Sequence, residues 1–229
     1  MISTALKDYF ISRGVQESKI TIVNMTVDTE RFKDVSRNNN GGRIISYCGT
    51  ASNNKDGVDQ LIKAFAIVAR IHQDVKLQII GKAPSEDDAS GNAQLVKQLG
   101  IENRVIFTGV VSAYKMPQIL VNSTILALDR PDSLQARNGF PTKLGEYLLS
   151  ERPVVVTKVG DIPRFLRDGE SALLAEYNNP EDFASKLCWL MEHPAEADEI
   201  GKAGAQVAKT HFNYKIETKK IASVIFSQQ

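Results

Sequence analysis

The stretch Val75-Lys76-Leu77-Gln78-Ile79-Ile80-Gly81 decides the fold, because it is short, rich in β-branched residues and ended by glycine. The run Pro153-Val154-Val155-Val156 is of the same kind and is introduced by proline. Short β-branched runs that are bounded by Gly or Pro and lie between helical segments are typical of strands in a parallel sheet that is covered on both faces. We therefore expect helices to cover both faces of this sheet.

On either side of these two runs, strand and helix patterns alternate along the chain. Further strands are predicted over residues 43–48, 105–108, 124–128 and 172–175. The predicted helices cover residues 57–72, 91–99, 112–121, 141–150, 162–167, 180–192, 195–211 and 216–226, and a long loop is expected over 129–140. This alternation predicts the α/β class, namely a Rossmann-like, three-layer α/β/α domain with a parallel sheet of about six strands.

The residues before this domain are organised differently. Ser3 is placed to cap a helix that Gly14 ends, and residues 20–23 are expected to form a short strand. Residues 33–42 are polar and rich in Asn and Gly, which is the composition of an exposed linker. We therefore expect two parts. Residues 1–42 hold a helix, a short strand and a linker, and residues 43–229 form the Rossmann-like domain.

The overall charge excludes one class of function. The chain has 229 residues, with 28 basic and 27 acidic side chains, which leaves a formal charge of +1. A protein that binds the nucleic-acid backbone needs a clear basic excess or a basic stripe. We therefore expect no nucleic-acid partner.

Cysteine use and the N-terminal residues indicate the compartment. Cys48 and Cys188 lie far apart in apolar segments, and neither belongs to a spacing that binds metal. The N-terminus lacks the basic start and apolar run of a signal peptide, and no apolar run approaches the ~20 residues of a membrane span. We expect a cytoplasmic protein with two buried thiols and no metal site.

The loop over residues 49–57 is the first candidate for chemistry. Gly49 and Thr50 are small enough for a ligand to approach the backbone, and Lys55 near a helix N-terminus can hold phosphate charge. The loop is neither a P-loop nor a dinucleotide fingerprint, because it lacks the glycine and lysine spacing of both. An ordinary polar connection with a surface lysine therefore remains an alternative interpretation.

The second candidate is the segment over residues 137–148. Gly139 allows a tight turn, Pro141 starts a helix, and Thr142 offers an N–H and a hydroxyl in its first turn, so the segment predicts an anion site suited to a diphosphate. Glu146 lies one turn beyond Thr142 and can accept hydrogen bonds from the hydroxyls of a ribose. The alternative is that Glu146 is solvated or pairs with Lys143.

The segment over residues 139–148, followed by the run over 152–157, resembles the donor site of the group 1 glycosyltransferases. These enzymes have the GT-B architecture, in which two Rossmann-like domains face each other across a cleft. The residues that resemble the family in order and spacing are 47–64, 77–81, 105–109 and 168–174, so the resemblance covers residues 44–212. Residues 22–32 resemble the crossover from the N-terminal domain of the family.

The resemblance implies a role for each matching residue. Lys55, beside the Gly49-Thr50 backbone, would contact the donor diphosphate, and Ile106 would bind the nucleobase through its main chain. The backbone amides that would face the sugar and the phosphates are those of Gly139, Phe140, Pro141 and Thr142. Glu146 would hold the ribose hydroxyls. No catalytic residue is assigned, and neither a metal nor a cofactor is implied beyond the nucleoside-diphosphate sugar itself.

The chain departs from the family at two positions. The family commonly has an arginine where this chain has Thr50, and a glutamate where it has Asn138. Threonine weakens the expected hold on the diphosphate. Asparagine can still bond a sugar hydroxyl, but it cannot place a negative charge near an oxocarbenium-like centre.

The resemblance implies the donor-binding half of a glycosyltransferase, which moves a sugar from a nucleoside-diphosphate sugar to an acceptor hydroxyl in polysaccharide or glycoconjugate synthesis. An acceptor-binding N-terminal domain would then belong to a separate or longer chain, and peripheral membrane contact would run through that half. We expect little turnover from the isolated chain. Two alternatives stay open. One is a non-catalytic nucleotide-sugar-binding subunit that needs an acceptor-binding partner, and the other is a sugar-nucleotide sensor, which Thr50 and Asn138 favour.

Overall fold

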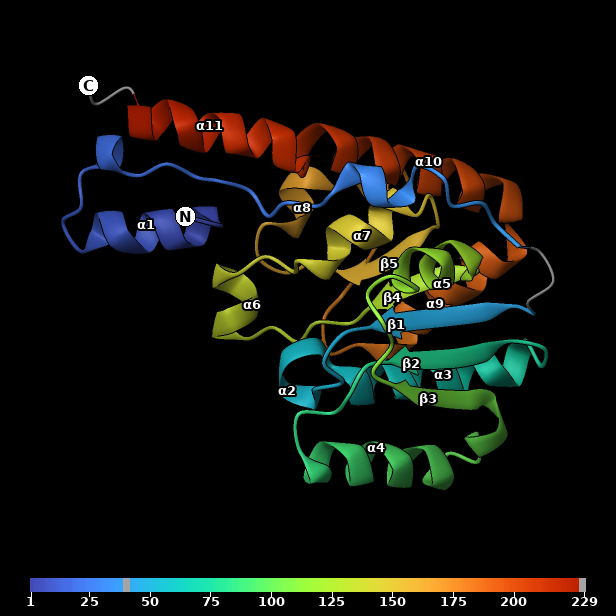
Figure 1. Ribbon diagram of the computed structural model, residues 1–229. Helices are drawn as coiled ribbons and strands as arrows, with labels where there is room; N and C mark the ends of the chain where they lie inside the picture. The colour runs from blue at the N-terminus through green and yellow to red at the C-terminus, as the bar shows by residue number, and fades with distance from the viewer. Residues whose placement is uncertain (39–41, 227–229) are drawn as a thin grey trace.

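The computed structural model describes residues 1–38 and 42–226, and its centre is one parallel six-stranded sheet (Figure 1). The strands are β1 (Ile44–Cys48), β2 (Lys76–Ile80), β3 (Val105–Gly109), β4 (Ile125–Leu128), β5 (Val154–Thr157) and β6 (Leu173–Ala175). Their order across the sheet is β3-β2-β1-β4-β5-β6, and every neighbouring pair is parallel. The predicted Rossmann-like α/β fold is therefore confirmed.

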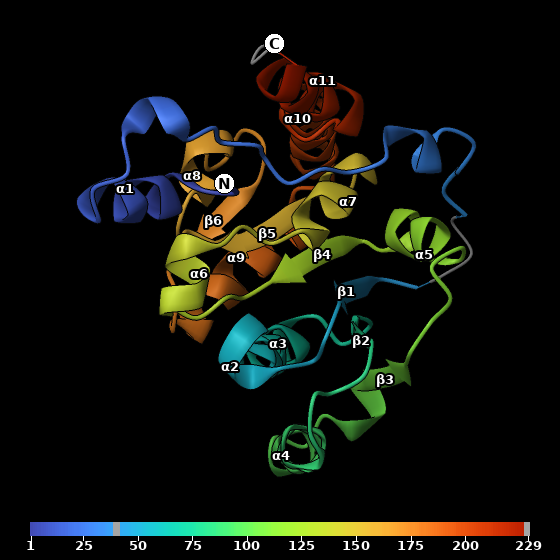
Figure 2. The same cartoon turned by 60° about the vertical axis from the view of Figure 1, so that its left-hand side comes forward.

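Helices cover both faces of the sheet. The α-helices of the described residues are α1 (Thr4–Ser12), α2 (Asn53–Asp56), α3 (Val58–Ile71), α4 (Glu86–Gln98), α5 (Met116–Asn122), α6 (Leu134–Asn138), α7 (Lys143–Leu149), α8 (Ile162–Phe165), α9 (Pro180–Glu192), α10 (Pro194–His211) and α11 (Tyr214–Phe226). Figure 2 shows α3 and α9, which pack on each other, on one face, and α5 and α7 on the other. The predicted apolar stripe of α3, from Leu61 to Val68, is buried against the sheet because its residues recur at helical spacing.

The chain reverses its direction of travel across the sheet at β1. From β1 it moves outward through β2 to β3, and it then returns to the other side of β1 to form β4. In open parallel sheets, ligands bind beyond the carboxyl ends of the strands at such a switch point. Figure 1 shows the arrowheads of β1, β2 and β3 pointing toward the side on which α2 lies. The loops after β1 and β4 therefore define the place to look for a site.

Two glycines allow the loops at this edge to touch. Gly81 has φ +123°, and a Cβ on it would lie 1.9 Å from the carbonyl oxygen of Gly49. Gly57 has φ +59°, and a Cβ on it would lie 2.1 Å from the carbonyl oxygen of Asp129. No side chain fits at either contact, so only glycine lets the loops after β1, β2 and β4 close on one another.

The N-terminal segment differs in part from its prediction. The helix begins as expected, because the Ser3 hydroxyl accepts a hydrogen bond from the Leu6 N–H at 3.2 Å. Residues 20–23 form no strand, since the Val23 N–H donates to the Met1 carbonyl at 2.8 Å rather than to a sheet edge. In the predicted linker, the Gln118 side chain donates to the Ser36 carbonyl at 2.9 Å. Residues 39–41 of that linker lie outside the described residues.

Three predicted helix boundaries are wrong for local reasons. The helix expected from Ser112 begins at Met116, because the Ser112 carbonyl, not its side chain, accepts a hydrogen bond from the Lys115 N–H at 2.9 Å. The helix expected from residue 91 begins at Glu86, since Ser85 caps it and three acidic residues stabilise its first turn. The helix expected from Pro141 begins at Lys143.

The predicted loop over residues 129–140 contains the one-turn helix α6. Ser133 caps this helix, because its hydroxyl accepts a hydrogen bond from the Ala136 N–H at 3.1 Å. The segment was expected to be a loop because a single turn carries too few residues for a helical apolar pattern to show.

Candidate functional site

A cavity of about 520 Å³ opens at the carboxyl end of β1. It is enclosed by the β1–α2 loop, the start of α7 and the segment before β1. The residues that line it are Thr26, Val27, Asp28, Arg31, Cys48, Gly49, Thr50, Lys55, Asp56, Thr142, Lys143 and Glu146. Of the residues predicted to bind a ligand, the structure thus brings together Gly49, Thr50, Lys55, Thr142 and Glu146.

Lys55 stands on the one-turn helix α2 with its side chain exposed at the cavity. The Ser52 hydroxyl fixes the start of this turn by accepting a hydrogen bond from the Lys55 N–H at 3.2 Å. Among residues 1–38 and 42–226, no carboxylate forms an ion pair with Lys55. Its ammonium is therefore available to an anionic ligand.

Glu146 points into the cavity and is paired with Arg31. The Arg31 guanidinium donates a hydrogen bond to the Glu146 carboxylate and a second one to the Ala113 carbonyl at 2.8 Å. The two partners are 115 positions apart in the chain, so no local spacing predicts their contact. Sequence reasoning missed Arg31, and the likeness of residues 22–32 to a crossover segment was the signal that could have found it. A ligand that bonds Glu146 has to share it with Arg31 or displace Arg31.

Lys143 does not pair with Glu146, which was the alternative considered for that glutamate. Its Nζ lies 2.5 Å from Oδ2 of the buried Asp56 and 3.0 Å from the Tyr47 hydroxyl, which in turn donates to the same carboxylate oxygen at 2.8 Å. Burial lowers the pKa of Lys143, the charge of Asp56 opposes this, and the nearby Lys55 adds to it. Burial also raises the pKa of Tyr47, so its hydroxyl stays protonated at neutral pH.

The structure does not bring four other predicted residues to the cavity lining. The Asn138 side chain donates to the Leu134 carbonyl at 2.8 Å, within α6. The Gly139 N–H donates to the Gln135 carbonyl at 2.9 Å, so this amide is not free to bond a ligand. Phe140 packs in the core, with its ring centroid 5.5 Å from that of Phe165 and 5.2 Å from that of Phe212. Pro141 is buried before α7.

Ile106 also lies away from this cavity. It is the second residue of the edge strand β3, where it pairs with Gln78, and its side chain is 39% exposed. The cavity opens at the carboxyl ends of the central strands, whereas Ile106 is near the amino end of its own strand. A main-chain contact from Ile106 to a nucleobase therefore finds no support in this geometry.

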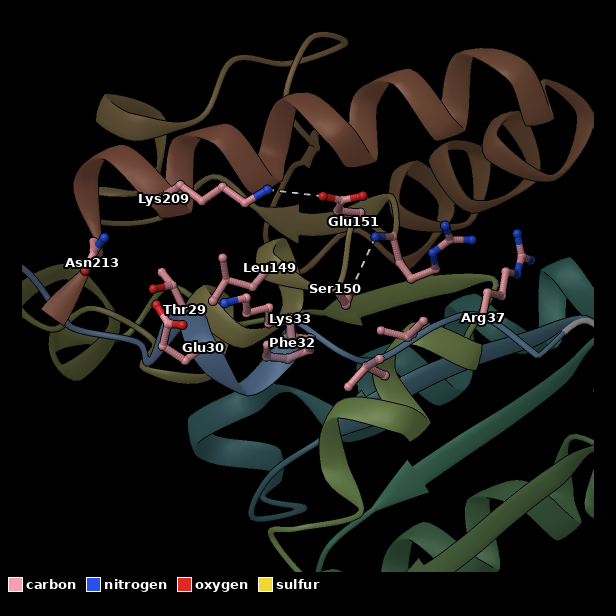
Figure 3. A pocket seen from close by; sticks show the side chains of 13 residues that line it. Thr29, Glu30, Phe32, Lys33, Arg37, Leu149, Ser150, Glu151, Lys209 and Asn213 are labelled. Carbon is pink, nitrogen blue, oxygen red and sulfur yellow. Dashed lines mark hydrogen bonds and ion pairs between the residues drawn. The ribbon is translucent and has the colours of Figure 1, made fainter. Parts of the chain in front are cut away.

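A larger cavity of about 740 Å³ lies elsewhere, between residues 29–37 and the C-terminal ends of α7 and α10. Figure 3 shows Glu151 and Lys209 forming an ion pair across its wall, at 3.2 Å. Leu149, Ser150 and Glu151 line it, and these residues precede β5, at the amino end of the sheet. Because ligands of this fold bind at the opposite edge, the smaller cavity is the better candidate.

Two features are absent from the described ranges. In residues 1–38 and 42–226, no group of three or more His, Cys, Asp or Glu side chains is placed to hold a metal ion. Over the same ranges, no helix has both the length and the apolar character needed to cross a bilayer.

Two charged residues are buried just after β4, beside the cavity. Arg130 is 3% exposed, and its Nε and Nη1 have no hydrogen-bond partner within the described part of the chain. Asp129 is 1% exposed, and burial raises its pKa to about 7, with Asp59 adding to the shift and Lys63 opposing it.

Replacing Asp129 with asparagine should stabilise the protein increasingly as the pH rises. The carboxyl has a pKa near 4 when unfolded and about 7 when folded, so the folded state holds the proton more strongly and loses stability between these values. From pH 5 to pH 8, the stability gained by Asp129→Asn should grow by about 2 to 3 kcal/mol. Urea unfolding of both proteins at each pH measures this, and a gain that does not change with pH would contradict it.

The fold and the cavity at the switch point define a Rossmann-like ligand-binding domain. The family model described as "Glycosyl transferases group 1" matches residues 42–193. The chain belongs to this family, as the resemblance predicted.

Curated relatives are longer than this chain. Mannosylfructose-phosphate synthase of Agrobacterium fabrum is 26% identical over an alignment of 227 residues, which covers 93% of this chain and 48% of the relative. A D-inositol 3-phosphate glycosyltransferase of Corynebacterium glutamicum is 25% identical, covering 80% of this chain and 43% of the relative. The chain spans about half the length of the curated relatives it matches.

Solved structures share the fold. Anabaena Alr3699/HepE in complex with UDP superposes with a TM-score of 0.85 at 20% identity, covering 98% of this chain and 62% of that one. The C-terminal domain of the group 1 family protein LpcC from Francisella tularensis gives a TM-score of 0.70 at 23% identity, covering 82% of this chain and 99% of that domain. This chain therefore matches almost the whole of the isolated LpcC C-terminal domain.

Proposed function

We propose that this chain binds the nucleoside-diphosphate sugar of a glycosyltransferase, which transfers the sugar to an acceptor hydroxyl in polysaccharide or glycoconjugate synthesis. One observation carries the proposal. A single cavity at the switch point is lined by Lys55 with the Gly49-Thr50 backbone, which the resemblance assigns to the diphosphate, and by Glu146, which it assigns to the ribose. Family membership and the UDP bound to the similar Anabaena protein support the same class of ligand.

The chemistry of the cavity suits a departing diphosphate. During sugar transfer, negative charge builds on the diphosphate, and a cation placed in advance stabilises that charge. Lys55 is such a cation, because no carboxylate among the described residues neutralises it. The Glu146 carboxylate can accept hydrogen bonds from two ribose hydroxyls once the ion pair between Arg31 and Glu146 is broken.

A second, acceptor-binding domain is part of the proposal, on a separate or longer chain, with residues 1–42 as the crossover between the domains. The helices α1 and α11 support it, because Figure 1 shows both projecting past the carboxyl end of the sheet. Their exposed apolar side chains are Tyr9, Phe10, Ile11, Tyr214, Ile216, Ile221, Val224, Ile225 and Phe226. Exposed apolar side chains that gather into one patch mark contact surfaces. Without that domain, the chain is expected to bind the donor but to transfer little sugar.

A thermal-shift panel of UDP, GDP, ADP and their sugars tests the proposal. At a concentration of about 100 times its Kd, a cognate nucleotide should raise the Tm by about 5 to 10 °C, because it binds only the folded state. The Glu146→Gln variant is the control, because the same nucleotide concentration should raise its Tm less when binding at the cavity is weakened. If no member of the panel shifts the Tm, the cavity is not a donor site.

A further inference from the structure

We propose that Lys143 is a second phosphate-binding cation, which supplies the positive charge that Thr50 lacks. This inference rests on the proposed function, because it concerns the diphosphate of the same ligand. The resemblance gave Lys143 no role, and the sequence offered it only as a possible partner of Glu146. Its placement in the structure is different.

The Lys143 ammonium lies directly against the loop that follows β1. A Cβ added to Gly49 would be 2.2 Å from its Nζ, so the ammonium occupies the space beside the Gly49 backbone. Thr50 is the next residue, and Lys55 lines the same cavity from α2. Lys143 therefore approaches the backbone at residues 49–50 from α7, while Lys55 approaches the cavity from α2. A diphosphate beside this loop would meet both cations.

Contacts within the protein use two of the three N–H donors of the Lys143 ammonium and leave the third without a partner among the described residues. Asp56, at 2.5 Å, and the Tyr47 hydroxyl, at 3.0 Å, account for two of its hydrogen bonds. The Tyr47 ring centroid lies 4.6 Å from Nζ, which adds a cation–π contact. An ammonium has three N–H donors, and no third partner is found among the described residues. A side chain fixed this firmly loses little entropy when it donates to a ligand.

The buried charges around Lys143 do not balance. Asp56, which is 2% exposed, is the carboxylate that contacts Lys143, and its charge also acts on the buried guanidinium of Arg130. Asp56 thus faces two cations, and the adjacent buried carboxyl, Asp129, carries only part of a charge at neutral pH because burial raises its pKa to about 7. Two guanidinium nitrogens of Arg130 have no partner within the described ranges. A positive excess at low dielectric attracts an anion more strongly than an exposed lysine does. A diphosphate in the cavity would compensate this excess.

The competing interpretation is structural, with Lys143 serving only to tie α7 to the β1–α2 loop through Asp56. Titration calorimetry of the binding of UDP and uridine, and of GDP and guanosine, distinguishes the structural role from the phosphate-binding role. Removing the lysine alone would leave the buried Asp56 carboxylate without its ion-pair partner, so the main variant is the neutral pair Lys143→Met with Asp56→Asn. Lys158→Met with Glu176→Gln is the matched control, because it removes an exposed ion pair that lies outside the cavity lining.

The neutral pair should bind the nucleoside diphosphate at least about tenfold more weakly than the wild type, with nucleoside affinity unchanged within about twofold. The dependence of diphosphate affinity on salt should also fall. Lys143→Gln, which keeps a hydrogen-bond donor beside Asp56, should show the same selective loss if the double variant melts too low to be measured. Unchanged diphosphate affinity in a folded variant overturns the role of Lys143 alone. A wild-type chain that binds none of the four probes overturns the proposed function as well.

Discussion

Replacing Glu146 with glutamine should weaken the binding of a nucleoside diphosphate and of its parent nucleoside alike, by about tenfold to a hundredfold. The substitution keeps the shape of the side chain but removes the charge that strengthens hydrogen bonds from ribose hydroxyls. Both ligands carry the ribose, so both should lose affinity. This pattern differs from that of the Lys143 variants, which should affect only the diphosphate.

Glu30→Gln is the matched control for this prediction. Glu30 is an acidic side chain of the same N-terminal segment as Arg31, and it pairs at 3.0 Å with Lys215, outside the cavity lining. Its loss should leave nucleotide affinity unchanged. Titration calorimetry with both ligands measures the two variants. A Glu146→Gln protein that binds nucleoside and nucleotide like the wild type would show that this carboxylate does not hold the ribose.

Gly81→Ala should destabilise the protein by about 3 kcal/mol or more, which places it among the most damaging single substitutions. The new methyl group would lie 1.9 Å from the carbonyl oxygen of Gly49, and that backbone cannot move without displacing the loop that forms the cavity. The positive φ of +123° adds a backbone cost of its own. The stability of the fold and the shape of the cavity should therefore be lost together.

Gly100→Ala measures the cost of placing a side chain at positive φ without a steric clash. Gly100 also has a positive φ, +67°, but a Cβ on it would meet no atom within 4 Å. Its substitution should cost only about 1 to 2 kcal/mol. Urea unfolding of both variants gives the comparison. Equal losses would mean that the close approach of the two loops at Gly81 does not matter.

The central part of the fold could be predicted because strands that are buried on both faces are rich in apolar residues, a pattern that can be recognised in the sequence. The run Val154-Val155-Val156 is wholly apolar, the run over residues 75–80 is apolar except at Lys76 and Gln78, and the stripe of α3 recurs at helical spacing. The run over residues 20–23 shows the limit of this reasoning. Its β-branched residues suit a strand, but its backbone bonds to Met1 instead, and only tertiary structure decides between the two.

The candidate site could be predicted only where its parts are local. Lys55 and Glu146 stood out because each belongs to a motif of a few residues, and the fold brings both to one cavity. The contacts Arg31–Glu146 and Lys143–Asp56 span 115 and 87 positions, and no periodicity carries that information. Phe140 shows the converse, since a residue within a binding motif can serve the core.

The two lysines at the cavity differ in a way that bears on function. Lys55 is exposed, so its charge attracts a ligand but is screened by salt. Lys143 is mostly buried, with its side chain 18% exposed, and is held by Asp56. An exposed cation promotes capture, and a fixed one stabilises charge in a set position, which is the property that transition-state stabilisation requires. On the proposed function, the pair would offer both properties to one diphosphate.

A crystal structure of this chain with a bound nucleoside diphosphate, grown with the nucleotide that gives the largest thermal shift, tests the central claim most directly. The phosphates should lie beside Gly49 and Thr50, within hydrogen-bond distance of Lys55 and Lys143, and the ribose hydroxyls should contact Glu146. A nucleotide bound in the larger cavity beside Glu151 and Lys209, or one whose phosphates face neither lysine, would contradict the assignment of the donor site.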